Sequence, residues 1–203
     1  MKRHGNLWDK IIDPDNLYLA YRKARKGKAW QKGILEFEKD VEGNLLKLQK
    51  MLCKGEFTTS EYRSKTIYEP KEREIYILPF YPDRIAQHAL LQVVAPIWDN
   101  LMIHDSYACR EGKGMHDASR KTMRHVHNYK YCLKCDISKF YPSIDHNILM
   151  DIIEHKIKCK PTLVLLDDIV RSFGGGKNTP IGNYTSQWFG NLYMNELDNN
   201  LKQ

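Results

Sequence analysis

The chain has 203 residues, of which 42% are hydrophobic, so it can bury a sizeable core as one domain or two small ones. Lysine and arginine exceed the acidic residues, which gives a formal charge of +7 and favours a polyanionic partner without identifying one. The sequence contains neither an apolar signal core nor a run of membrane-spanning length, so we expect a cytoplasmic protein without a membrane partner.

Helices and basic residues dominate residues 1–57. Asp13-Pro14 is typical of a helix start, because Asp caps the first turn and Pro suits its first position. The end of this helix is crowded with basic residues: Arg22, Lys23, Arg25, Lys26 and Lys28. This cluster is either a solvated face or an RNA-binding face. A second helix is predicted from Gly33 to Lys54.

Residues 58–80 favour β-structure. Short β-favouring runs at 62–68 and 75–78 flank the segment Glu69–Arg73, which predicts a hairpin tip. Lys71 and Arg73 alternate along this segment, so both can reach one anion, although a charged, solvated turn is the alternative. Asp83 is predicted to cap the long helix that follows, and Pro96 to kink it.

The middle and the end of the chain are again helical. Gly112 and Gly114 precede a predicted helix. Five of its residues lie along one face: Met115, Ala118, Thr122, Val126 and Tyr129. Ser143 or Asp145 is predicted to cap a later helix, beside His146, which we interpret as a surface residue. A further helix follows Pro161. The glycine-rich segment 174–177 lacks the spacing of a phosphate loop, so we interpret it as a flexible connector to a terminal helix.

Residues 132–146 contain the strongest candidate for chemistry. Leu133, Cys135 and Ile137 alternate on one face of a predicted strand, and Asp136 points the other way. A carboxylate on the open face of a sheet suits Mg²⁺-dependent phosphoryl transfer, since hard cations take oxygen ligands. For this residue taken alone, a strand end without function is the alternative. Tyr141 follows in the next turn.

The five cysteines are scattered and form no disulfide framework. Cys132 and Cys135 have the Cys-x-x-Cys spacing with which a zinc site can begin, but no second ligand pair follows at finger spacing. Because both fall within the predicted strand, we interpret them as reduced structural thiols.

Five segments between about residue 60 and residue 203 resemble, in the family order, the sequence blocks of reverse transcriptases. Asp136–His146 resembles the first catalytic block, and Pro180–Gln187 with Asn191-Leu192-Tyr193 resembles the next. The upstream segments resemble nucleotide-gripping and template-facing blocks: Glu69–Arg73, Pro82-Asp83-Arg84 and Ser106–Arg110. The shared order argues against coincidence.

The resemblance implies an α+β fold, namely the fingers and partial palm of a right-hand polymerase, helix-rich with a small antiparallel sheet. It divides the chain into an N-terminal helical basic region (1–57), fingers (58–130) and a partial palm (131–203). Reverse transcriptases continue into a Tyr-x-Asp-Asp hairpin with two further metal-binding aspartates, and then a thumb. We therefore expect an N-terminal piece with little or no activity by itself.

The resemblance also implies roles for individual residues. Asp136 and the Ile137 carbonyl would hold the two Mg²⁺ ions of the complete enzyme. Lys71 and Arg73 would grip the triphosphate of an incoming deoxynucleotide. Tyr141 matches the aromatic side chain that excludes a 2′-hydroxyl, although a core aromatic is the alternative.

The remaining implied contacts concern template and primer. Ile181 and Gly182 would lie against the incoming nucleotide and the template base, and template contacts are implied for Ser106, Tyr107, Arg110 and Gln187. Many relatives carry glutamine where this chain has Ile181, and the run that follows looks most like the enzymes of diversity-generating retroelements.

The implied partners are an RNA template, a DNA or RNA primer and deoxynucleoside triphosphates, with an accessory protein left open. Alternatives are a group II intron or retron enzyme, a non-catalytic RNA-binding module, and a basic protein with a structural role.

Overall fold

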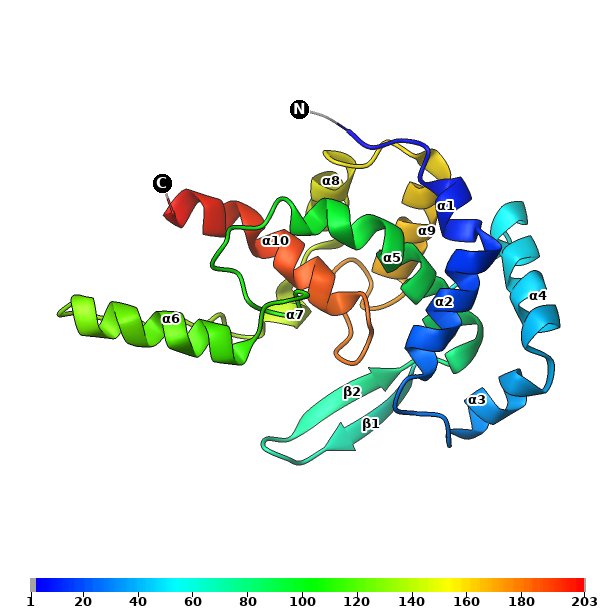
Figure 1. Cartoon of the computed structure of the whole chain (residues 1–203), viewed down its shortest axis with the longest axis horizontal. Coiled ribbons are helices and arrows are strands. Elements are labelled where there is room, and N and C mark those ends of the chain that lie inside the picture. Colours follow the sequence, from blue (N-terminus) through cyan, green and yellow to red (C-terminus); the bar gives the residue numbers. More distant parts are fainter. Residues whose placement is uncertain (1–2, 203) are drawn as a thin grey trace.

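The structure, a computed structural model, describes residues 3–202. They form ten α-helices, two short helical turns and one two-stranded antiparallel sheet. The long helix α5 (Ile85–Asp99) runs through the body of the molecule and packs against α2 (Pro14–Arg25) and α1 (Trp8–Ile12) (Figure 1). The prediction of a helix-rich α+β fold with a small antiparallel sheet is confirmed.

The N-terminal helices follow their capping signals. The Asp13 carboxylate accepts hydrogen bonds from the backbone N–H groups of Asp15 and Asn16 at 3.0 and 3.2 Å, and so begins α2 as predicted. The single helix predicted over 33–54 is wrong in one respect. It is divided into α3 (Lys32–Phe37), the 3₁₀ turn η1 (Glu38–Asp40) and α4 (Val41–Lys54). The break occurs because the Asp40 side chain caps α4.

The hairpin forms where the sequence predicts it. Strands β1 (Arg63–Ile67) and β2 (Arg73–Ile77) pair from Arg63 opposite Ile77 to Ile67 opposite Arg73, which leaves residues 68–72 as the tip. The segment η2 (Phe80–Arg84) joins the hairpin to α5 and is kinked at Tyr81, whose backbone is extended with φ −119° and ψ 134°.

The role predicted for Asp83 as a helix cap is wrong. Asp83 is fully buried, and its carboxylate accepts hydrogen bonds from the backbone N–H and the hydroxyl of Ser60 at 2.9 and 2.7 Å. This bidentate contact fixes the base of the hairpin to the start of α5.

Helix α6 (Met115–Asn128) projects away from the other helices (Figure 1). None of its described residues is buried, and the side chains of Met115 and Val126 are 78% and 61% exposed. Asp105, in the loop before it, forms ion pairs with Lys121 of α6 and with Lys202 near the end of the chain. Polar contacts of this kind hold the start of α6 in place.

The strand predicted around Leu133–Ile137 is absent. Residues 131–137 are exposed, have no regular secondary structure and pair with no other segment of the chain described here. A strand needs a partner for its backbone groups, and local alternation cannot supply one. Cys132 and Cys135 are free thiols, which confirms that they are reduced, but both are exposed, so the prediction that they are structural is wrong.

The C-terminal part comprises α7 (Phe140–Ser143), α8 (His146–Glu154), α9 (Lys160–Arg171) and α10 (Ser186–Leu201). Asp145 caps α8 as predicted, but His146 is fully buried and its Nε2 lies 2.8 Å from the Asn178 carbonyl oxygen. The surface interpretation of His146 is therefore wrong.

The glycine-rich segment 174–177 is fixed to its surroundings instead of being a loose connector. The Gly176 carbonyl accepts from the backbone N–H of His146 at 3.0 Å, and the Asn178 N–H donates to Ile144 at 2.9 Å. A Cβ at position 174 would lie 1.9 Å from the Lys177 carbonyl oxygen, so this turn requires glycine.

One hydrophobic core connects the N-terminal helices, α5 and the C-terminal helices. Its largest fully buried side chains include Trp98 of α5, Leu149 of α8 and Phe189 of α10. The core crosses the borders proposed at 57 and 130, and the division into three regions stays a prediction. In the part of the chain that the structure describes, no helix is both long and apolar enough to traverse a bilayer.

Candidate functional site

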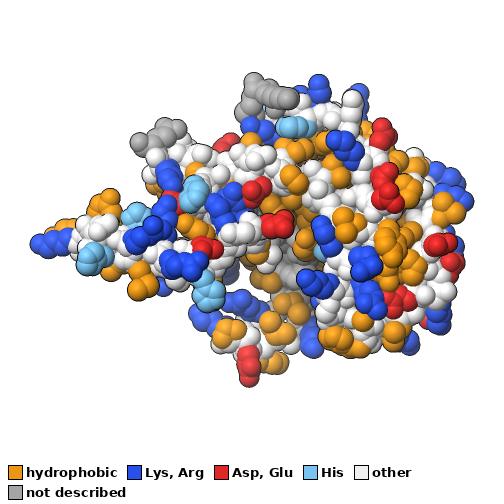
Figure 2. Space-filling model, in the orientation of Figure 1, with side chains coloured by type: hydrophobic (Ala, Val, Ile, Leu, Met, Phe, Trp, Pro, Cys, Tyr) orange, Lys and Arg blue, Asp and Glu red, His pale blue; other side chains and the backbone are white. Residues whose placement is uncertain are grey.

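A groove of about 490 Å³ lies between the C-terminal end of α2, strand β2, the start of α5 and the loop before α10. Figure 2 shows a hollow in this part of the surface with basic side chains around it. Five lining side chains are cationic and none is a carboxylate; the cations are Lys23, Lys26, Lys28, Arg73 and Arg84. None of these five takes part in an ion pair among residues 3–202. The groove therefore suits an anion.

The inner cations are only partly hydrated. Burial lowers the pKa of Arg84, and burial followed by the nearby Arg84 charge lowers the pKa of Lys28. Both lowered pKa values indicate that the charged forms of Arg84 and Lys28 lose part of their hydration in the groove. A bound phosphate would offset that loss by supplying the missing counter-charge.

The loop at the bottom of the groove is joined directly to the hairpin. The Tyr76 backbone N–H donates to the Ile181 carbonyl at 2.7 Å. Gly182 has a φ of +109°, and a Cβ at this position would lie 2.7 Å from the Tyr76 carbonyl oxygen. The Asn183 amide donates to the Tyr62 hydroxyl at 3.1 Å. Glycine is thus required at 182 because the backbone of β2 passes against it.

Tyr141 is positioned by close packing against α10. A Cβ at position 190 would lie 3.0 Å from the Phe140 ring and 3.4 Å from the Tyr141 ring, so Gly190 lets both aromatic side chains approach the helix. The Thr179 backbone N–H also donates to the Tyr141 carbonyl at 3.1 Å. Burial raises the pKa of the Tyr141 phenol, which therefore stays protonated at neutral pH.

Asp136 lies just before α7, five residues from Tyr141, with an exposed side chain. It does not line the groove. Its carboxylate and the Ile137 carbonyl are oxygen donors of the type that Mg²⁺ takes. Among residues 3–202, however, no three His, Cys, Asp or Glu side chains gather as a metal site. The donors present fit a divalent cation but do not complete its shell.

The groove brings together five of the predicted site residues: Arg73, Tyr141, Ile181, Gly182 and Gln187. Lys71 lies at the exposed hairpin tip and does not line the groove. Ser106 and Tyr107 lie in the loop between α5 and α6, also outside it.

The side chain of Arg110, for which a template contact is predicted, is bound within the protein. Its side chain is only 7% exposed, and its guanidinium donates to both carboxylate oxygens and the carbonyl of Asp99 and to the carbonyls of Ile103 and Ser106. The shortest of these bonds joins Nε to the Asp99 Oδ1 at 2.6 Å. All five donors of a guanidinium are thereby used. Arg110 thereby fixes the loop that follows α5, and its contact with a template stays a prediction.

Sequence reasoning missed His88, which lines the groove. Arg84 and Tyr184 also line it, and they lie in the family-like segments Pro82–Arg84 and Pro180–Gln187 without a role assigned to either side chain. The rings of His88 and Tyr184 are stacked, with centroids 3.9 Å apart and planes 14° from parallel. A histidine and an arginine one helical turn apart at the start of an apolar helix were the available signal. For the lysines of residues 23–28, the sequence allows either a solvated face or an RNA-binding face. The groove favours an anion-binding face.

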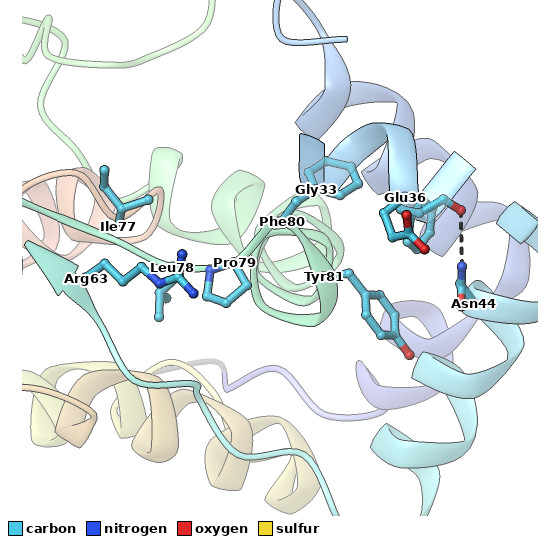
Figure 3. Close-up of a pocket in the computed structure, with 10 residues that line it drawn as sticks. Gly33, Glu36, Asn44, Arg63, Ile77, Leu78, Pro79, Phe80 and Tyr81 are labelled. Carbon is cyan, nitrogen blue, oxygen red and sulfur yellow. Dashed lines mark hydrogen bonds between the residues drawn. The ribbon is translucent and has the colours of Figure 1, made fainter. Parts of the chain in front are cut away.

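Two further cavities adjoin this region. One, of about 370 Å³, continues the groove toward Cys109 and Trp188, and it shares Lys23, Tyr184 and Gln187 with the groove. The other, of about 460 Å³, lies on the far side of the hairpin base, between α3 and η2. Figure 3 shows the apolar residues of the second cavity, with Arg63 beside the hairpin. It shares no residue with the groove.

Residues 69–203 match the model of the family described as "Reverse transcriptase (RNA-dependent DNA polymerase)". The chain belongs to the reverse transcriptase family. It is 25% identical over 206 residues to the group II intron-encoded protein LtrA of Lactococcus lactis, covering 95% of this chain and 34% of that protein. It is 23% identical over 214 residues to protein YkfC of Escherichia coli, covering 95% and 56% respectively.

The chain is also 22% identical over 93 residues to nuclear intron maturase 1 of Arabidopsis thaliana. This shorter match covers 46% of this chain and 13% of that protein. The chain thus spans about a third of the length of LtrA and little more than half of YkfC.

Proposed function

We propose that this chain provides the nucleotide-binding and template-binding part of an RNA-directed DNA polymerase. The observation that carries the proposal is the groove, in which Arg73, Tyr141 and Gly182 meet although more than a hundred residues separate Arg73 from Gly182. Family membership supports the same activity. The substrates would be deoxynucleoside triphosphates and a DNA or RNA primer paired to an RNA template.

Each residue contributes a distinct step in this proposal. Arg73 binds the triphosphate inside the groove, and Lys71 reaches the same anion from the hairpin tip. The Tyr141 ring packs beneath the sugar and leaves no room for a 2′-hydroxyl. Asp136 and the Ile137 carbonyl would hold divalent metal ions, which when bound supply charge stabilisation for the primer hydroxyl and the leaving pyrophosphate. The single carboxylate requires further ligands for a two-metal site.

The subfamily remains a choice between two candidates. Ile181 and the run Gly182–Gln187 support an enzyme of a diversity-generating retroelement, because an apolar side chain replaces an amide near the nascent pair. Two of the relatives above are named for introns, which favours a group II intron enzyme. Sequencing complementary DNA made by the wild type and by Ile181→Gln separates them. Frequent errors at template adenines that fall in the variant support the retroelement enzyme, and uniform fidelity supports the intron enzyme.

Steady-state primer extension by the full-length product of the gene tests the triphosphate contact. Arg73→Gln removes a charge-assisted contact worth about 1.5–3 kcal/mol, so the KM for deoxynucleotides should rise about 10- to 100-fold. Arg63→Gln is the matched control, because Arg63 belongs to the other strand and lines the cavity on the far side of the hairpin. Equal effects of the two substitutions would contradict the proposed role of Arg73.

A further inference from the structure

We propose that Tyr184, supported from behind by His88, is a stacking platform for an unpaired base of the template strand, with Lys23, Lys28 and Arg84 binding the adjoining phosphates. This inference rests on the proposed function, since it assumes that the groove takes nucleic acid. It assigns a base-binding role to Tyr184, which lies in the family-like segment Pro180–Gln187 but has no contact assigned to it there. The supporting His88 lies outside all five family-like segments.

The geometry of the two rings provides the platform. The His88 imidazole covers one face of Tyr184 at a centroid distance of 3.9 Å, yet the tyrosine remains 44% exposed. Tyr184 lines both the groove and the cavity that continues it, so its exposed surface faces them. Aromatic rings placed in this way stack on any base, because every base has a π-face.

The backbone on either side of Tyr184 is held in place, and the His88 ring supports one face of its side chain. The residues on either side of Tyr184 are buried: Asn183 donates to the Tyr62 hydroxyl, and the Thr185 carbonyl accepts from the Phe189 backbone N–H at 3.0 Å. A ring held by its neighbours loses little conformational freedom when a base stacks on it.

The histidine behind the platform is uncharged at neutral pH. Burial and then the charges of Arg84, Lys23 and Lys28 lower the pKa of His88 to about 4. A neutral imidazole can lie among these cations without adding to their repulsion. The three cations stay available for phosphate because none of them forms an ion pair in the described part of the chain.

The position of Tyr184 favours a strand over a single nucleotide. The ring lies where the groove of about 490 Å³ joins the cavity of about 370 Å³, and Lys23 and Gln187 line both as well. A ligand that covers this junction therefore extends in both directions, as consecutive nucleotides do. Alternating cations and an aromatic ring are the usual means of binding single-stranded nucleic acid.

The test uses the chain of 203 residues and a short single-stranded RNA that carries one 2-aminopurine, a base whose fluorescence falls when it stacks. Binding is followed by anisotropy and stacking by fluorescence quenching. Tyr184→Leu removes the ring at similar volume, and Tyr184→Phe retains it. Tyr18→Leu is the control, because Tyr18 is 48% exposed but lines a different cavity. An RNA with one abasic position tests the contact without altering the protein.

We expect Tyr184→Leu to bind about 5- to 100-fold more weakly and to lose the quenching. Tyr184→Phe and Tyr18→Leu should behave like the wild type, and the abasic RNA should bind the wild type as weakly as intact RNA binds Tyr184→Leu. Unchanged binding of both the variant and the abasic RNA would overturn the platform while leaving template binding intact.

Two further outcomes separate the inference from the proposed function. If Tyr184→Leu weakens the binding of a deoxynucleoside triphosphate but not of RNA, the base on the platform belongs to the nucleotide and the inference is wrong. If the wild-type chain binds no RNA at any salt concentration, both the platform and the proposed template binding fail.

Discussion

Replacing Gly182 by alanine should separate the hairpin from the loop that precedes α10. The added Cβ would lie 2.7 Å from the Tyr76 carbonyl oxygen, and this oxygen belongs to the backbone of β2, so it cannot turn aside as a side chain would. A left-handed backbone costs alanine about 1–2 kcal/mol. Loss of the Tyr76–Ile181 hydrogen bond costs about 1 kcal/mol more. We therefore expect Gly182→Ala to lower the free energy of unfolding by about 2–3 kcal/mol.

Gly27→Ala is the matched control for this substitution. Gly27 has a φ of +71°, but no atom outside its chain neighbours lies within 4 Å of a Cβ built there. Gly27→Ala should lower the free energy of unfolding only by the backbone contribution of about 1–2 kcal/mol. Urea unfolding of both variants measures the difference. If Gly182→Ala destabilises the protein no more than Gly27→Ala, the close passage of β2 over residue 182 is refuted.

Two further predictions concern buried charge and pH. Arg110→Lys should lower the free energy of unfolding by about 2–3 kcal/mol, because an ammonium cannot replace the five-bond geometry on Asp99 and its neighbours; stability equal to the wild type in urea unfolding would contradict this. The folded-state pKa of His88, about 4, lies below the ordinary 6.5, so the unfolded chain binds a proton first as the pH falls. Between pH 6.5 and pH 4, the free energy of unfolding of the wild type should therefore fall by about 3 kcal/mol more than that of His88→Gln. If the free energies of unfolding of the two proteins change in parallel with pH, the lowered pKa of His88 is refuted.

Local signals in the sequence predicted the local structure well. The caps at Asp13 and Asp145 depend on neighbouring backbone groups, and the hairpin of 63–77 depends on a turn and two short runs. The 131–137 segment shows the limit of such reasoning. Its alternation of polar and apolar side chains is real, but a strand also needs a distant partner, and no described residue provides one.

The candidate site shows the same division between local and distant information. Family-like motifs identified Arg73, Tyr141 and Gly182, and the structure places all three around the groove. The groove-lining lysines Lys23, Lys26 and Lys28 were open to two interpretations, because they are remote in sequence from the motifs. The motif that contains Arg110 could not show that its guanidinium forms an ion pair with Asp99.

The central claim is that Asp136 belongs to a polymerase active centre beside this groove. Incorporation of deoxynucleotides on an RNA template by the full-length product of the gene, in Mg²⁺, compares the wild type with Asp136→Asn. Asp9→Asn is the control, because Asp9 of α1 is exposed. Asp105→Asn would not serve as a control, because it breaks two ion pairs. Incorporation should fall to background in Asp136→Asn and stay at the wild-type level in Asp9→Asn. Undiminished synthesis by Asp136→Asn would contradict the assignment.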